Sequence, residues 1–385
     1  MAFQKNSRIS AVPEKYLEFA GVVPKQPQDD LGAYLRVKGL EGLGASWMLA
    51  NLVAEEASNI ALRVFLLDNS GSTSKSDGHV LRPDQQHRIV SLPATRWEEI
   101  CATAMEQAEW NCQARIPAEF HLLNPGPGRP QEGRDFVTVS ADGDSGQLSQ
   151  LQQMLKRNGP RGTTPLAARI QDLRRRLVDH VPDGRIMLCV VTDGVPTCSN
   201  GGPAGQQDFV VQLRTFATTM DAFMVIRLAT DDSSVVDYYN RIDEELELPL
   251  DILDDLQGEA EELHRCGNGW FAYTPILHRI REGGSLEKLF DLLDERALGV
   301  AEISRMLELL LRSPEDPPFP RQPDELYAVA ARKLAEVPPV FNGRLNRMTL
   351  PVDLPLLKKA LGLSRWQRTK TALFRNFMCG SKKLP

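Results

Sequence analysis

The sequence predicts an α/β protein with a doubly wound, mostly parallel sheet flanked by helices, followed by a mainly helical C-terminal extension. Two observations indicate this fold. Short apolar runs are typical of strands buried on both faces of a sheet, and residues with helical spacing fill the intervals between these runs. Strands that alternate with helices imply parallel crossover connections, which build a doubly wound sheet.

Apolar runs mark the expected strands in chain order. The central strands are expected at residues 63–67, 186–191 and 222–226, where nearly every side chain is apolar. Two more are expected at 118–123 and 135–139. We expect the last of these at an edge of the sheet.

Apolar residues three or four positions apart mark the expected helices. The clearest stripe starts at Leu166 and repeats through Leu177, with Pro165 suited to the first helical position. Asp144 or Ser145 is a candidate cap for the helix that precedes it. The expected helices lie around residues 97–108, 146–157, 166–177 and 209–216.

Changes in composition along the chain predict four segments. Residues 1–58 are expected to form an N-terminal arm and lead-in, and residues 59–250 the α/β domain. A helical extension is expected over 251–340. A basic tail is expected over 341–385.

The overall composition is that of a soluble globular protein: the 385 residues are 42% apolar and 25% charged, with a net charge of -6. This charge argues against nucleic acid as a partner. The six cysteines lack paired spacing, which predicts reduced thiols. We see no signal-like N-terminus and no run of about 18 apolar residues, so we expect a cytoplasmic protein.

Polar residues follow two of the expected central strands directly. Asp68, Ser70 and Ser72 come after the first strand, and Asp193 follows the strand that ends near residue 191. Between them, Thr164 opens a helix. Because ligands bind at the carboxyl ends of the strands in such sheets, we expect these side chains to converge at one edge.

These five residues offer three hydroxyls and two carboxylates, which are hard oxygen donors suited to Mg²⁺ or Mn²⁺. Ser70, Ser72 and Thr164 are expected to bind the ion directly, and Asp68 and Asp193 through water. Because these hydroxyls are neutral, the cation is expected to stay electrophilic at an open position, which a partner's carboxylate would fill. Taken singly, the first motif could be an ordinary turn and Thr164 a helix cap.

The order of these motifs resembles the von Willebrand factor A domain and its metal-ion-dependent adhesion site. Asp68, Ser70 and Ser72 match its Asp-x-Ser-x-Ser, while Thr164 and Asp193 match its second and third loops. The resemblance covers roughly residues 60 to 230 and implies a Rossmann-like fold and a Mg²⁺ or Mn²⁺ site. Phrases such as Arg96-Trp97-Glu98 look like those of stand-alone intracellular fungal and protist proteins with this domain.

The chain departs from the family's pattern at several places. Thr163 replaces a glycine and could itself compete for the ion, and Thr73 stands where methionine is common. Residues 73–94 form a long connection that carries Lys75, His79, Arg82 and His87. We expect this connection to line the rim of the site and to influence the choice of partner.

We therefore expect a non-catalytic binding module: an intracellular scaffold or adaptor that binds an Asp or Glu of a partner protein through the cation. One alternative, which the resemblance implies because some intracellular members of this superfamily have that role, is a subunit of a ring ATPase. The chain would then need a separate ATPase as a partner, because it has no nucleotide-binding loop of its own. A less favoured alternative is a metal-assisted hydrolase, which would need Asp231, Asp232 or His79 as a base.

The last thirty residues mix bases with apolar groups, including Arg365, Trp366 and Phe374. Such a stretch can make weak contact with an anionic membrane. It can also dock on the acidic region between Asp231 and Glu262 of the same chain. Both charged segments can equally be solvated surface.

Overall fold

A computed structural model describes residues 40–84, 88–141, 145–178, 184–198, 202, 204–245 and 248–363. Residues 1–39 of the expected N-terminal arm and lead-in lie outside this range, as do the basic stretch beyond Leu363, His87 and the candidate cap Asp144. Within the described residues, no helix combines the length and the apolarity needed to cross a membrane.

Among the described residues, six strands form a mostly parallel sheet in the order β5-β4-β1-β6-β7-β8. Only β5 runs antiparallel, and it lies at an edge, as the sequence predicts. The mixed α/β class with a mostly parallel sheet is therefore confirmed. The strands are β1 (Ile60–Leu67), β4 (Ala118–Leu122), β5 (Phe136–Val139), β6 (Arg185–Thr192), β7 (Ala222–Leu228) and β8 (Leu250–Leu253).

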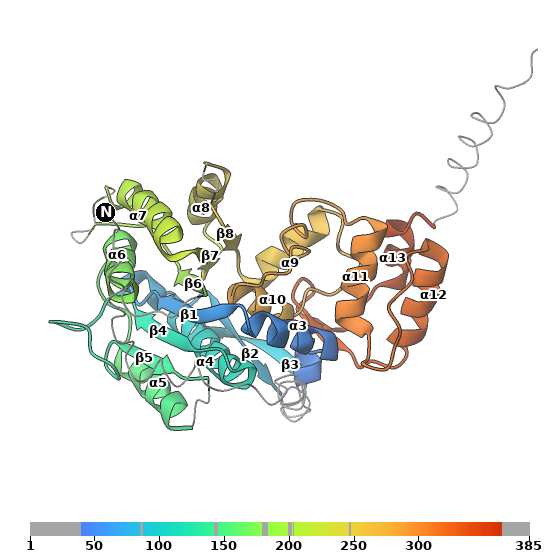
Figure 1. Ribbon diagram of the computed structural model, residues 1–385, viewed down its shortest axis with the longest axis horizontal. Coiled ribbons are helices and arrows are strands. Elements are labelled where there is room, and N and C mark those ends of the chain that lie inside the picture. Colours follow the sequence, from blue (N-terminus) through green and yellow to red (C-terminus); the bar gives the residue numbers. More distant parts are fainter. Residues whose placement is uncertain are drawn as a thin grey trace, which may run out of the picture.

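Helices cover both faces of this sheet (Figure 1). Val64 and Leu66 of β1 point into a core with α6, α7 and α8, while Phe65 points into a second core with α4 and α5. This alternation follows from the two-residue period of a strand, and apolar residues on both faces bury the sheet. The helices are α4 (Arg96–Ala114), α5 (Ser145–Arg157), α6 (Leu166–Leu177), α7 (Gly205–Met220) and α8 (Ser233–Glu245).

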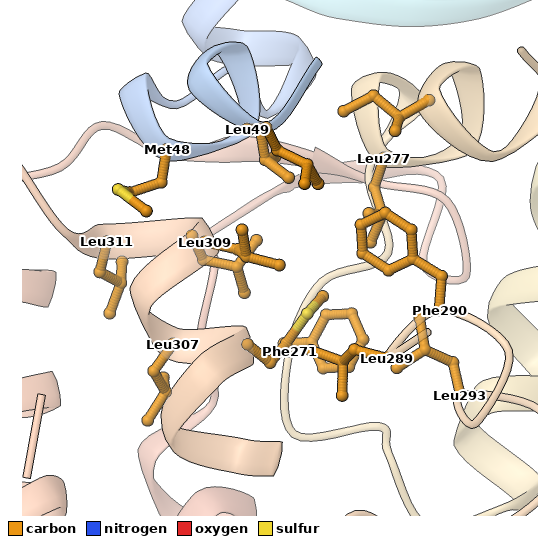
Figure 2. Packing of buried hydrophobic residues seen from close by; sticks show 14 of the residues in the cluster. Met48, Leu49, Phe271, Leu277, Leu289, Phe290, Leu293, Leu307, Leu309 and Leu311 are labelled. Carbon is orange, nitrogen blue, oxygen red and sulfur yellow. The ribbon is translucent and has the colours of Figure 1, made fainter. Parts of the chain in front are cut away.

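A third apolar core forms a C-terminal lobe, which Figure 1 shows at one end of the molecule. Phe290 and Leu309 are among the buried side chains that meet there (Figure 2). Its elements are α9 (Leu256–Arg265), α10 (Pro275–Glu282), α11 (Val300–Leu311), α12 (Pro323–Leu334), α13 (Leu354–Ala360) and the hairpin of β9 (Val340–Asn342) and β10 (Arg347–Thr349).

Helix α3 (Trp47–Ala57), which comes just before the first strand, belongs to this same core. It follows a short 3-10 helix, η2 (Leu40–Leu43), and packs against α11. Met48 and Leu49 are buried next to Leu309 (Figure 2). The lead-in to the α/β domain therefore takes part in the C-terminal lobe instead of remaining separate. The sheet also extends to Leu253, beyond the expected domain end at residue 250.

The connection expected as a long loop at residues 73–94 is largely ordered. A 3-10 helix, η3 (Gly71–Ser74), leads into an antiparallel hairpin of β2 (Gly78–Pro83) and β3 (Ile89–Ala94). Val80 is buried while its neighbours His79 and Leu81 are not. This two-residue alternation, which indicates a half-buried strand, explains why the stretch folds.

Two local expectations need correction. Pro165 is the cap of α6, and the first helical residue is Leu166, because the φ of -80° and ψ of 54° at Pro165 are not helical. Within the expected helical extension, Leu286 lies in irregular backbone and Leu289 and Leu293 lie in turns, although their side chains are at least partly buried in the lobe. Buried leucines at helical spacing are therefore not sufficient to predict a helix there.

Candidate metal centre

The carboxyl ends of β1 and β6 lie side by side and carry the two predicted aspartates at the same edge. Leu67 pairs with Val191 in the parallel register, and the amide of Asp68 donates to the Val191 carbonyl at 2.9 Å. Asp193 follows β6 directly. Because β4 lies on the opposite side of β1, this edge is a switch point in the strand order, where doubly wound sheets bind ligands.

The carboxylate of Asp68 is buried and held at both oxygens. Its Oδ1 accepts from the amide of Ser70 at 2.8 Å, and its Oδ2 accepts from the hydroxyl of Thr192 at 2.6 Å. The first bond folds the turn after β1 back on the strand, which orients the following serines. Thr192, the last residue of β6, is a second anchor that the sequence reasoning did not assign.

A chain of hydrogen bonds connects the two serines to the second aspartate. The Oγ atoms of Ser70 and Ser72 lie 2.9 Å apart, and the Ser72 hydroxyl donates to Oδ1 of Asp193 at 2.8 Å. Residues separated by more than a hundred positions in the chain thus present their oxygens to one another. Ser70 and Asp193 are nearly wholly buried, whereas Ser72 is half-buried.

Thr164 reaches the same edge from the loop before α6. Its amide donates to the Thr197 hydroxyl at 3.0 Å, and its carbonyl accepts from the Thr197 amide at 2.9 Å. A Cβ placed on Gly194 would lie 3.7 Å from Oγ1 of Thr164, so this hydroxyl stands next to the residue that follows Asp193. The structure therefore brings all five predicted residues to one edge of the sheet.

The loop that carries Thr164 depends on Gly162. Its φ is +76°, a left-handed conformation, and a Cβ there would lie 2.8 Å from Oδ1 of Asn124. The carbonyl of Gly162 accepts from the Gly71 amide at 3.1 Å, which links this loop to the first motif. The carbonyl of Thr163 accepts from Nδ2 of Asn124 at 2.9 Å.

Arg96 is the main residue of the site that the sequence reasoning missed. Its Nη1 donates to Oδ2 of Asp193 at 3.0 Å, and its Nε and Nη2 bind both oxygens of Asp77 at 2.7 and 2.6 Å. The guanidinium is almost completely buried. Burial by itself lowers the pKa of Arg96, but the ion pairs with Asp77 and Asp193 raise it above its ordinary value.

A weak signal for Arg96 existed in the sequence. Thr95 and Glu98 form the pattern of a capping box, which predicts the start of a helix and places Arg96 in its first turn. Nothing in that local pattern indicates that the arginine is buried against Asp193. Thr73, noted as a departure from the family's pattern, is buried and donates to the carbonyl of Ser70 at 2.8 Å, so it supports the turn.

Burial is the main reason that the pKa of Asp68 is raised, to about 6, and the nearby charge of Asp193 adds to it. Hydrogen bonds from Thr192 and Ser70 act in the opposite direction. The carboxylates of Asp68 and Asp193 thus lie close together away from water. Burial and mutual repulsion both disfavour a negative charge on Asp68 when Asp193 is ionised. A divalent cation between them would relieve this repulsion.

The donor set fits a hard divalent cation. Ser70, Ser72 and Thr164 provide neutral oxygens, and the carboxylates of Asp68 and Asp193 provide the negative charge that Mg²⁺ or Mn²⁺ favours. Arg96 neutralises one oxygen of Asp193 and leaves the other directed to Ser72. Among the described residues, no group of three or more His, Cys, Asp or Glu could hold a metal ion, so a site of that type is not observed there.

Of the other residues considered for metal or base chemistry, Asp231 is exposed, while Asp232 and His79 make hydrogen bonds within the fold. Oδ1 of Asp232 accepts from both the amide and the hydroxyl of Ser234, at 3.0 and 2.7 Å, as a cap of α8. His79 lies in the β2–β3 hairpin, where its amide donates to Oε2 of Glu99 at 2.8 Å. The backbone carbonyl of Lys75 accepts from the Arg96 amide at 3.0 Å, and this bond joins the segment before the hairpin to α4.

No known protein family matches this chain, and no curated protein matches it.

Proposed function

We propose that this protein is a metal-dependent protein-binding module of the von Willebrand factor A type, with the role of an intracellular scaffold or adaptor. Ser70, Ser72 and Thr164 would bind Mg²⁺ or Mn²⁺ directly, and Asp68 and Asp193 would act through bound water. A partner would contribute an aspartate or glutamate to the open position. The proposal includes no catalytic step.

The observation that carries this proposal is the hydrogen-bonded chain from Ser70 through Ser72 to Asp193, at the strand-end edge next to Asp68. The oxygens of this chain come from residues 68–72 and from Asp193, and Thr164 approaches from a third segment beside Gly194. Here the hydroxyls and carboxylates also have the identity and the number that a hard cation prefers.

The chain's own residues would set the affinity for a partner. Neutral hydroxyls leave more positive charge on a bound cation than direct carboxylates do, and this charge is what attracts a partner carboxylate. Asp77, which directly precedes β2, and Asp193 form ion pairs with Arg96 and hold it beside the site. When bound, the cation would supply a Lewis-acid position, and Arg96 would add a nearby positive charge.

Calorimetric titration of the metal-free chain with MgCl₂ and MnCl₂ tests the site. We expect one equivalent of cation to bind wild type. Asp68→Asn and Ser72→Ala should weaken the affinity by at least about tenfold, the usual effect of losing one ligand or its support. Asp237→Asn, at an exposed position on α8, is the matched control and should bind as wild type does. Absence of uptake by wild type would exclude the proposed site.

Partner capture from cells tests the binding role separately. The tagged full chain should retain its specific partners in Mg²⁺ and lose them in EDTA. Asp68→Asn should lose the same partners in Mg²⁺, while Asp237→Asn should keep them. Circular dichroism of each variant verifies the fold. Equal capture with and without EDTA would contradict metal-dependent binding even if the cation itself binds.

A further inference from the structure

An open groove of about 400 Å³ lies on the C-terminal lobe, between the β9–β10 hairpin and the start of α13. Phe271 and Val352, which are buried in the lobe, form part of its floor. The described residues that line the groove include none of the five predicted metal-site residues. The groove is therefore a surface feature separate from the candidate metal centre.

The rim of this groove is apolar although it faces solvent. Among the described residues, five large apolar side chains are exposed, and two of them, Leu345 and Leu350, line the groove at 38% and 51% exposure. Leu354 and Leu356 of α13 also line it and are half-buried. Single exposed apolar side chains are common on proteins, but several around one groove indicate a surface that another segment covers.

The charged side chains of the groove are mainly basic. Arg344 and Arg347 line it, and the side chain of neither has an ion pair among the described residues. The acidic residue of the lining, Asp353, caps α13, because its Oδ1 accepts from the Leu356 amide at 2.9 Å. An occupant that combines apolar side chains with carboxylates would therefore match the groove.

The described part of the chain begins beside this hairpin. The first described element, η2, contacts β9, and a Cβ placed on Gly42 would lie 3.5 Å from Cε of Met348 in β10. Met348 lies between Arg347 and Thr349, which line the groove, so its side chain points to the opposite face of the hairpin. The residues before Leu40 therefore need to pass one edge of a two-stranded hairpin to reach the groove.

The preceding chain is long enough for this path. An extended chain spans about 3.3–3.6 Å per residue, so the five residues from position 35 to position 40 can cover up to about 17 Å. Neighbouring strands are only about 4.8 Å apart, and packed layers are about 10 Å apart. Residues up to position 35 can therefore lie in the groove while η2 keeps its place.

Residues 29–35 have the composition that the groove requires. Leu31, Tyr34 and Leu35 place three large apolar side chains within five positions. Asp29 and Asp30 precede them directly, and no base occurs in this segment. The apolar side chains match the leucines of the rim, and the two carboxylates match its arginines.

The other terminal segment is a poorer match for the groove. Residues 364–385 carry six bases and no acid. Arg344 and Arg347 would repel these bases, since like charges brought together disfavour binding. The charge of the groove therefore favours the N-terminal segment over the C-terminal one.

We propose that residues 29–35 of the same chain occupy this groove. Their apolar side chains cover Leu345 and Leu350, and their two aspartates pair with Arg344 and Arg347. This contact ties the N-terminal segment to the C-terminal lobe. It requires no cation, so it is independent of the function proposed above.

Photo-crosslinking in the full chain tests the proposal. The photoreactive residue p-benzoylphenylalanine is placed at Leu350, and mass spectrometry of the digested protein identifies the segment to which it becomes joined on irradiation. We expect the main product to join position 350 to residues 27–39 of the same chain. The same group at Val211, which is 57% exposed on α7, is the matched control and should not react with this segment.

Two sets of variants test the contacts separately. Leu35→Asp should lower the yield of this product at least about threefold, because it brings a charge into an apolar groove. Leu17→Asp makes the same change outside the proposed segment and should leave the yield as in wild type. Arg344→Glu with Arg347→Glu should lower the yield at least about twofold. Adding Asp29→Lys and Asp30→Lys should restore it, because the charges are then exchanged.

Four results would overturn the proposal. The first is a main product with residues 364–385 or with a second copy of the chain, which the mass of the product reveals. The second is no product with residues 27–39 above the level of the Val211 control. The others are an unchanged yield in Leu35→Asp and a failure of the charge exchange to restore the yield.

Discussion

Asp68 shows how one buried side chain links the fold to the chemistry of the proposed metal site. The turn that follows β1 and the end of β6 enclose its carboxylate, so water cannot solvate the charge. This burial, together with Asp193, raises its pKa to about 6. The protonated form is therefore favoured in the folded, cation-free protein more than in the unfolded chain.

The expected consequence is a pH dependence of stability that Asp68→Asn removes. Because the folded pKa exceeds the unfolded value of about 4, the contribution of Asp68 is complete below pH 4 and is lost as the pH rises to 6. Over this window, wild type in EDTA should lose up to about 3 kcal/mol of unfolding free energy relative to Asp68→Asn. Urea unfolding at several pH values measures this difference.

Asp237→Asn is the control for that experiment, because residue 237 is exposed on α8. Its stability should follow that of wild type at every pH. If Asp68→Asn also followed wild type in parallel from pH 4 to pH 6, the raised pKa of Asp68 would be wrong.

The first turn of α4 joins the proposed metal site to the buried ion pairs around Arg227. Arg96 binds Asp193, and Glu99, one turn further on, binds Arg227. Thr95 holds the start of this helix through a reciprocal capping box: its hydroxyl accepts from the Glu98 amide at 3.2 Å, and its amide donates to Glu98 at 2.7 Å. The cap therefore fixes the position of both ion pairs.

Thr95→Ala should lower the free energy of unfolding by about 1 kcal/mol, because it leaves an amide at the start of the helix unsatisfied. Thermal and urea unfolding measure the change. Thr219→Ala, at an exposed position near the end of α7, makes the same substitution without a cap and should stay within about 0.5 kcal/mol of wild type. Equal effects of the two substitutions would contradict the role of Thr95 as a cap.

Helix α3 connects the sheet to the C-terminal lobe, because it packs in the core of the lobe and is followed directly by β1. Ser46 caps α3 by accepting from the Leu49 amide at 3.1 Å, and its hydroxyl donates to the Leu309 carbonyl of α11 at 2.5 Å. The chain then runs from α3 directly into β1. Loss of packing in the lobe is therefore expected to affect the sheet as well.

Leu309→Ala should cost about 2–5 kcal/mol, since Leu309 is completely buried and its removal leaves a cavity. Leu350→Ala, at a side chain that is 51% exposed, should change the unfolding free energy by less than about 0.5 kcal/mol. Far-UV circular dichroism and tryptophan fluorescence should show one coincident transition for each protein. Separate transitions for the lobe and the sheet would contradict a shared core.

Local pattern in the sequence was sufficient to predict the two strands that carry Asp68 and Asp193 and the edge of the sheet that they share. The apolar runs around Val64 and Val190 identify two buried strands, and parallel strands end on the same side. Asp68 and Asp193 follow these strands at once, so their proximity can be inferred without coordinates. The spacing of Ser70 and Ser72 within one turn is equally local.

Long-range packing decided the remaining features. The pairing of Arg96 with Asp193, the contact of Ser46 with Leu309 and the ion pair of Arg227 with Glu99 all join segments distant in the chain. Such contacts leave no periodic signal in a single sequence, because they depend on which elements pack together. The residues around a site can thus be recognised from their order, but their electrostatic partners emerge only when the chain is folded.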